Sequence, residues 1–351
     1  MPLLLLSGCT KVIHLPDPEE PQASTAPIVT VIYDPGALGD RTYNDLIYLG
    51  VEEAATRLGL RTVQLSPKDY EEGIAYLEAM KMAVKEDTVR RLYIVAATSF
   101  DEHLRKIAPV FNDAPRADLL YLETTKTLAG SKGSTLFMPY YGAMYEAGAL
   151  IPTLYPNAVV VASNPVDQTV AEAVAGITEG FSQKYFDTSA SWWETFSIER
   201  SLQTIYLADE PGQGYSLPDS TAIHILRDVI DELPGPILIP LCGGAGHRMA
   251  YYAESLVYIP FMGIDHKNDS KDSFLSAVKH IDRAVGTCIE QWLSPEGMPK
   301  HQVLGLASGL TEVIVHPRYT SEVELIEQMV TPEIREQIHR DAIKKEEAYE
   351  R

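Results

Sequence analysis

The chain has 351 residues, 45% of them apolar, which is enough for two ordinary domains or for one large two-lobed unit. Its formal net charge of −20 argues against partners that need a basic surface, so we expect neither nucleic acid nor an anionic lipid surface. Cys9, Cys242 and Cys288 have no spacing typical of a zinc site or a disulfide framework, so we expect no metal and no cofactor.

The first residues resemble an export signal. Residues 3–9 read Leu-Leu-Leu-Leu-Ser-Gly-Cys, similar to a bacterial lipobox, in which a diacylated cysteine becomes the mature N-terminus. Residues 16–27 are rich in Pro, Glu, Ser and Ala and suit a solvated tether. We therefore predict a signal and linker over 1–26 and export to the bacterial cell envelope, with a lipid on Cys9 as the membrane contact. A chance run of leucines is the alternative.

Strand and helix patterns alternate from Ile28 onward. Short apolar runs predict the strands, and apolar residues at helical spacing predict the helices between them. The first series has expected strands at 28–33, 62–65, 92–96 and 119–122, and expected helices at 46–58, 70–84 and 101–110. Repeated βα units of this length predict a parallel, doubly wound sheet whose strand-to-helix loops lie along one edge.

A second series begins near Gly133. The expected strands are 136–138, 158–162, 201–207, 237–241 and 258–265, and the expected helices are 141–155, 166–185, 220–233 and 274–288. The charged tail from 322 has helical composition, and we expect it to fray beyond Ile338. Two successive series favour an α/β architecture of two doubly wound parallel-sheet lobes with a hinge, the type I periplasmic-binding-protein fold, with the ligand between the lobes.

The expected lobes are discontinuous in the sequence. We assign 27–133 with about 264–298 to the first lobe and 134–263 with about 299–320 to the second. Residues 321–351 form the expected C-terminal helical tail.

The stretch from Asp34 to Gly50 is the first candidate site. It follows the strand 28–33 and places Asp40, Thr42 and Asn44 around a helix N-terminus. Ligands of open parallel sheets bind outside the carboxyl ends of the strands, which is where this loop lies. The alternative is structural: Thr42 or Asn44 caps the helix, and the glycines only form the turn.

Two further motifs follow expected strands. Gly243-Gly-Ala-Gly246 precedes a helix expected to begin near His247; it lacks the third glycine of a dinucleotide fingerprint, but it would let a ligand lie close to the backbone, or it only forms a tight turn. Asp265 ends a strand, and Lys279 lies near an apolar stripe where burial requires a partner. A turn aspartate and a lysine extending to the surface are the alternatives.

Together these motifs resemble the basic membrane protein family, the PnrA-like nucleoside-binding lipoproteins of ABC importers. The similarity lies in Asp-x-Thr-Tyr-Asn at 40–44 with aromatic-x-Gly at 48–50, Gly-Gly-x-Gly at 243–246, Gly-Ile-Asp at 263–265 and Ser-x-x-Lys at 276–279. The resemblance implies ligand contacts at Asp40, Asn44 and Gly244, stacking of Tyr48 on a purine, and base recognition by Asp101, with Glu102 as the neighbouring register. It also implies that Asp265 and Lys279 hydrogen-bond the ribose hydroxyls.

The resemblance implies a monomeric, lipid-anchored solute-binding protein that presents a purine nucleoside or similar ligand to an ABC permease and has no catalytic residues. For the family's second stacking aromatic, Cys242 stands near the position, and Trp192 or Trp193 of the aromatic segment 187–200 could substitute. One alternative is a ligand-sensing lipoprotein. Another is a nucleoside or sugar hydrolase that uses Asp40, Asp265 and His247, although the sequence has no nucleophile elbow.

Overall fold

The computed structural model describes residues 25–40, 43–189, 191–210, 212–257, 259–265, 273–316 and 320–349. Cys9, the signal and most of the linker lie outside the described residues, as does Thr42. Side chains at 192, 195, 230, 256, 257, 274 and 320–323 are likewise not described. Within the ranges given, no helix combines the length and apolar character that a bilayer span requires.

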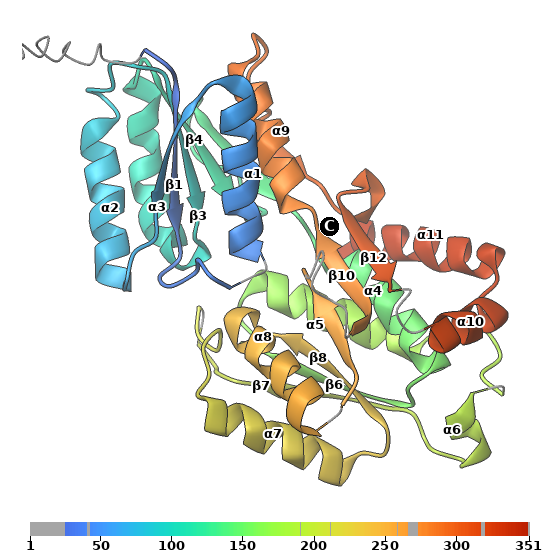
Figure 1. The fold of residues 1–351 in the computed structure, drawn as a ribbon. Coiled ribbons are helices and arrows are strands. Elements are labelled where there is room, and N and C mark those ends of the chain that lie inside the picture. The colour runs from blue at the N-terminus through green and yellow to red at the C-terminus, as the bar shows by residue number, and fades with distance from the viewer. Residues whose placement is uncertain are drawn as a thin grey trace, which may run out of the picture.

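The first lobe is built on a six-stranded parallel sheet of order β11-β5-β4-β3-β1-β2. Figure 1 shows β1, β3 and β4 with α2 and α3 on one side and α1 and α9 on the other. Its strands are β1 (Ile28–Tyr33), β2 (Arg61–Leu65), β3 (Arg91–Ala96), β4 (Ala117–Leu122), β5 (Gly133–Phe137) and β11 (His301–Val303). One face is covered by α1 (Tyr43–Leu58) and α9 (Ile281–Leu293), and the other by α2 (Tyr70–Ala83) and α3 (Asp101–Ile107). Short 3₁₀ turns, Thr98–Phe100 and Ala108–Asp113, flank α3.

The second lobe has a six-stranded sheet of order β12-β10-β9-β8-β6-β7, in which only the β10–β12 pair is antiparallel among the described pairs. Its strands are β6 (Asn157–Ala162), β7 (Ser201–Tyr206), β8 (Pro236–Leu241), β9 (Phe261–Ile264), β10 (Ser273–Lys279) and β12 (Thr311–Val315). One face packs on α4 (Tyr141–Leu150), α5 (Gln168–Ser182), α10 (Thr320–Met329) and α11 (Pro332–Tyr349), and the other on α7 (Asp219–Glu232) and α8 (Gly243–Tyr252). The shorter elements are Ile151–Thr153, α6 (Trp192–Thr195), Ala253–Val257 and Leu306–Ser308.

Helices on both faces explain the composition of the central strands. Every residue of β1, β6 and β8 is buried, because a parallel strand covered on two sides has no solvent-facing positions. This burial produces the continuous apolar runs from which the sequence predicts these strands. The edge strands β2 and β7 carry exposed residues instead.

The chain passes between the lobes three times. The first crossover, residues 138–140, joins β5 to α4; the second is His280, between β10 and α9; and the third, residues 304–310, joins β11 to β12. The second and third crossovers are joined by a hydrogen bond from His280 N to Leu310 O at 2.7 Å. β5 and β11 belong to the first sheet and β10 to the second, so residues 134–137, 273–279 and 301–303 lie in the opposite lobe to the one expected.

Two expectations for the C-terminal third were wrong. The segment 274–288 is not one long helix, because β10 occupies Ser273–Lys279 and α9 begins at Ile281. Leu275, Ala277 and Val278 are all fully buried between β9 and β12, and a strand buried on both faces has no periodicity that distinguishes it from a helix. The tail does not fray at Ile338: α11 extends to Tyr349 because it packs along α4.

Candidate functional site

The strand order places two topological switch points opposite each other. In each sheet the order of the strands reverses at one point, between β1 and β3 in the first sheet and between β6 and β8 in the second. Ligands of such sheets bind outside the carboxyl ends of the strands at this switch point. Asp34 follows β1 and Ser99 follows β3, whereas Asp167 lies shortly after β6. A Cβ placed on Gly212 of the second lobe would lie 3.8 Å from Ser99 Cβ, so the lobes meet here.

Carboxylates from both lobes occupy this meeting point. Asp34 accepts a hydrogen bond from the Ser99 hydroxyl. Burial raises the pKa of Asp34 to about 6; the hydrogen bonds from Ser99 act in the opposite direction, and the charge of Asp167 raises the pKa further. Asp167 accepts the Tyr215 hydroxyl at 2.9 Å and the Gly212 N–H at 3.1 Å. A ligand with hydrogen-bond donors would reduce the repulsion between the two carboxylates.

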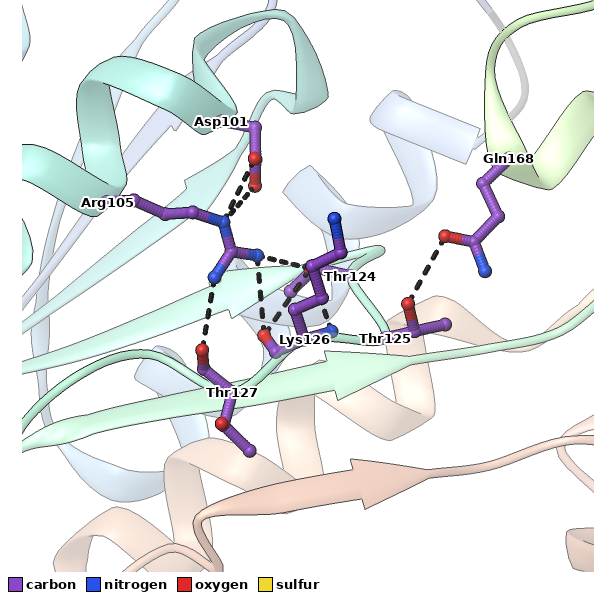
Figure 2. A network of polar contacts seen from close by, with 7 residues as sticks. All are labelled: Asp101, Arg105, Thr124, Thr125, Lys126, Thr127 and Gln168. Carbon is purple, nitrogen blue, oxygen red and sulfur yellow. Dashed lines mark hydrogen bonds and ion pairs between the residues drawn. The ribbon is translucent and has the colours of Figure 1, made fainter. Parts of the chain in front are cut away.

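A cavity of about 130 Å³ lies beside this point and is lined from both lobes. Thr125 Oγ1 of the first lobe donates to Gln168 Oε1 at the start of α5, at 3.2 Å (Figure 2). Residues 124–126 form part of the cavity wall from the first lobe. Arg105, which also lines the cavity, holds this loop through the carbonyl oxygens of Lys126 and Thr127 and the hydroxyl of Thr124. The lobes are therefore in direct contact around a small polar space.

Lys279 is the centre of a buried charged cluster at the hinge. It ends β10, its side chain is 2% exposed, and its Nζ lies 3.2 and 3.3 Å from the two carboxylate oxygens of Glu123, which follows β4. The same Nζ lies 4.1 Å from the ring centroid of Tyr140 and 5.8 Å from that of Tyr43. The Tyr43 hydroxyl donates to Glu123 Oε1 at 2.8 Å. The ion pair thus joins the last strand before the second crossover to the first lobe.

Asp265 adjoins this cluster. It is 4% exposed and has a φ of 53°, an uncommon value for a residue with a side chain, and its Oδ1 accepts the backbone N–H of Lys279 at 2.8 Å. Burial raises the pKa of Asp265 to about 6, although Tyr140 and Lys279 act in the opposite direction. The structure therefore brings Asp265 and Lys279 together, on adjacent strands of the second sheet.

Asp40 and Asn44 also lie together, but as the cap of α1. Asp40 Oδ2 accepts the N–H of Asn44 at 3.1 Å and its side-chain amide at 2.8 Å, and Asp40 Oδ1 accepts the N–H of Asp45 at 3.3 Å. These bonds satisfy N–H groups that the first turn of a helix leaves free. The capping role that the sequence left open for Thr42 or Asn44 is thus performed by Asp40.

Tyr48, Asp101 and Gly244, which were also expected to contact the ligand, lie apart from the Lys279 cluster. Tyr48 is 39% exposed on α1, in the first lobe. Asp101 lines the 130 Å³ cavity, and both of its oxygens accept from Arg105 Nε at 2.9 Å (Figure 2). Gly244 lies in the first turn of α8, which begins at Gly243 rather than near His247.

Of the residues expected at the second stacking position, Trp193 and Cys242 are buried away from the cleft, and the side chain of Trp192 is not described. Trp193 is 2% exposed and donates from Nε1 to Pro152 O at 3.2 Å, so it is a packing residue of α6. Cys242 is fully buried, and burial raises the pKa of its thiol to about 12. Tyr215 is the aromatic residue that reaches the second switch point: a Cβ on Gly243 would lie 3.1 Å from its Cδ1.

Several residues of the site were not proposed from the sequence. Glu123, Tyr43, Tyr140 and Tyr215 all contact charged groups of the cleft, and Glu172 accepts the Tyr140 N–H at 2.8 Å. Glu123 carries a usable signal, because it is an acidic residue directly after a buried strand. Tyr43 lies inside the first motif. For Tyr140, Glu172 and Tyr215 the sequence contains no comparable signal.

The residues of the hydrolase alternative come from separate elements. Asp40 precedes α1, Asp265 follows β9, and His247 lies within α8. Across the described ranges, no group of three or more His, Cys, Asp or Glu side chains is arranged to hold a metal ion.

No family model matches the chain. Among curated proteins, 74 residues are 30% identical to an uncharacterized lipoprotein of Pyrococcus horikoshii and to another of Pyrococcus furiosus. The matched segment is 21% of this chain and only 18–19% of those relatives.

Solved structures match over most of the chain. A solute-binding protein of an ABC transporter system from Aeropyrum pernix K1 has a TM-score of 0.62 with 16% identity, covering 92% of this chain and 86% of that one. A transcriptional activator of the comK gene from Bacillus halodurans has a TM-score of 0.63 with 15% identity, covering 92% and 97%. A solute-binding protein from Conexibacter woesei has a TM-score of 0.60 with 11% identity and the same coverage.

This chain has the type I periplasmic-binding-protein fold. The expected fold class is thereby confirmed. In this periplasmic-binding-protein fold the two switch points, the 130 Å³ cavity and the Lys279 cluster all lie along the boundary between the lobes.

Proposed function

We propose that the protein is an exported, lipid-anchored solute-binding protein that captures a purine nucleoside or a similar ligand between its lobes for an ABC importer. The observation that carries this proposal is the convergence of polar strand ends from both lobes on one boundary, with Asp265 and Lys279 adjacent in it. The names of two similar structures and of the curated lipoproteins agree with the general class.

The chemistry of the cluster suits a ligand with a vicinal diol. The ammonium of Lys279 has three N–H donors, and Glu123 need not use all of them. Asp265 uses Oδ1 for the backbone of Lys279, and a carboxylate has further acceptor positions. One hydroxyl can therefore accept from Lys279 while the other donates to Asp265, as the family resemblance implies.

An aromatic ligand needs a stacking surface. Tyr48 remains our expectation for the first lobe, and Tyr215 is the candidate for the second because it lies at the β6/β8 switch point and is 37% exposed. Stacking of a base on an aromatic side chain stabilises binding by about 1–3 kcal/mol. Asp101 would recognise polar groups of the base from the cavity wall.

The first experiment identifies what the protein carries. Mass spectrometry of the native, purified protein should detect a co-purified nucleoside, and calorimetry against a nucleoside panel should then rank affinities. Product analysis of the same mixtures separates binding from hydrolysis: stoichiometric thermal stabilisation without product supports the binder, whereas released base and ribose would support the hydrolase. A panel without any binding would contradict the nucleoside assignment.

A second candidate function is ligand sensing. It is favoured by the similarity to a protein described as a transcriptional activator, since the same fold then serves regulation in that protein. Uptake of a radiolabelled ligand by cells with and without this gene separates the two. Loss of uptake supports import, and unchanged uptake with altered gene expression supports sensing.

A further inference from the structure

The C-terminal helix α11 reaches the hinge through a buried carboxylate. Glu346 is 4% exposed; its Oε2 accepts the N–H of Gly142, and its Oε1 accepts the N–H of Leu306, both at 2.8 Å. Gly142 lies in the first turn of α4, directly after the first crossover, and Leu306 lies within the third. One side chain thus binds the third crossover and the helix turn that follows the first.

The backbone around Glu346 leaves space for its carboxylate. A Cβ on Gly142 would lie 2.7 Å from Oε2, and a Cβ on Gly305 would lie 2.1 Å from Oε1 and 2.7 Å from Pro139 Cγ. Any larger residue at either position would collide with the carboxylate. Tyr140, the N-cap residue of α4, makes no side-chain capping bond, and Glu346 accepts one of the N–H groups that the first turn of a helix leaves free.

Other contacts hold α11 along α4. His339 Nδ1 lies 2.9 Å from Glu146 Oε2, and the ring of Tyr349 stacks on that of Tyr141 with centroids 4.5 Å apart. Hydrogen bonding to Glu146 raises the pKa of His339, which favours its charged form beside that carboxylate. These contacts fix α11 to the second lobe, and Glu346 extends the attachment to the third crossover.

We propose that Glu346 is a hinge clamp, a positioning residue that fixes the first turn of α4, and with it the end of the first crossover, relative to the third crossover. The first crossover carries Tyr140, whose ring covers Lys279 Nζ, so the clamp also fixes one side of the buried cluster. The C-terminal helix thereby controls the stiffness of the hinge without touching the cleft. The clamp does not depend on the identity of the ligand.

Hydrogen exchange of the full chain, followed by mass spectrometry, tests the clamp. Glu346→Ala removes both acceptors, Glu346→Gln keeps one carbonyl oxygen, and Glu347→Gln is the matched control because Glu347 is exposed on the same helix. We expect exchange at 141–144 and 305–308 to rise about tenfold or more in Glu346→Ala. In Glu346→Gln the rise should be confined to one of the two segments, and the control should match the unaltered protein.

The comparison with β1 and β6 makes the test specific. If these central strands exchange as slowly as before while both crossover segments exchange faster, the clamp is supported. Unchanged exchange at the crossovers, or an equal rise along the whole chain, would overturn it. If Glu346→Ala does not fold, Glu346→Gln decides: faster exchange at either 141–144 or 305–308, with β1 and β6 unchanged, supports the clamp, and unchanged exchange at both segments overturns it. A failed nucleoside panel would leave this readout unaffected, so the clamp and the proposed function are tested separately.

Discussion

Replacing Lys279 should destabilise the protein more than replacing its partner Glu123. The Nζ lies 3.2 and 3.3 Å from the two oxygens of Glu123, and at an effective dielectric of about 20 such a pair attracts by about 5 kcal/mol before desolvation is subtracted. The charge of Lys279 also favours the ionised forms of Asp265 and Glu172. One ammonium therefore compensates the buried carboxylates of Glu123 and Asp265 at pH 7, whereas Glu172, with a pKa of about 8, is mainly protonated there.

The asymmetry follows from what each substitution leaves behind. Lys279→Met leaves Glu123 and Asp265 without their cation, and breaking a buried pair in this way costs roughly 3–5 kcal/mol. Glu123→Gln keeps the acceptor for the Tyr43 hydroxyl and leaves Lys279 beside two carboxyl groups, so we expect about half that cost. The double variant should be more stable than Lys279→Met, because the neutral amide that replaces the Glu123 carboxylate carries no charge to bury.

Urea unfolding at pH 7, followed by the intrinsic fluorescence of the three tryptophans, measures these free energies. Lys106→Met is the matched control, since the Lys106–Glu102 pair is 67% and 87% exposed, and its loss should cost less than about 1 kcal/mol. Equal costs for Lys279→Met and Glu123→Gln, or a double variant less stable than either, would refute the assignment of Lys279 as the shared cation.

Three further predictions concern separate features. Asp265→Ala should weaken nucleoside binding, measured by calorimetry, at least about tenfold, which is the loss expected for a charge-assisted hydrogen bond. Asp265→Asn keeps an acceptor for the Lys279 N–H and serves as the folding control. Unchanged affinity in Asp265→Ala would remove Asp265 from ligand recognition. Burial raises the pKa of Glu172 to about 8, so the folded state binds an extra proton between about pH 4.5 and 8, and its stability falls as pH rises through that window. Glu172→Gln should reduce the stability difference between pH 5 and pH 8 measured by urea unfolding, and an unchanged difference would contradict this. Gly50→Ala should lower the free energy of unfolding by about 1–3 kcal/mol in the same assay, because its Cβ would lie 2.3 Å from Asp282 O. Gly286→Ala, which has open space in α9, should raise it by up to about 1 kcal/mol. Similar values for the two variants would argue against close packing of α1 on α9.

The sequence predicted best the elements whose burial leaves an apolar pattern in neighbouring residues of the chain. The run Ile28–Tyr33 and the helical spacing after it predict β1 and α1, because a central parallel strand is apolar throughout and its helix has one apolar stripe. The same reasoning could not identify β10, since full burial removes the periodicity. Nor could it identify α11 beyond Ile338, where a charged sequence is held by the buried side chain of Glu346.

The candidate site shows the same division. The sequence by itself determined that Asp265 ends a strand and that Lys279, near an apolar stripe, would need a partner if buried. Only the tertiary structure decided that the partner is Glu123, 156 residues earlier in the chain, and that Tyr140 covers the ammonium. Composition and periodicity report the surroundings of each residue, whereas the choice of a partner depends on three crossovers that bring distant strand ends together.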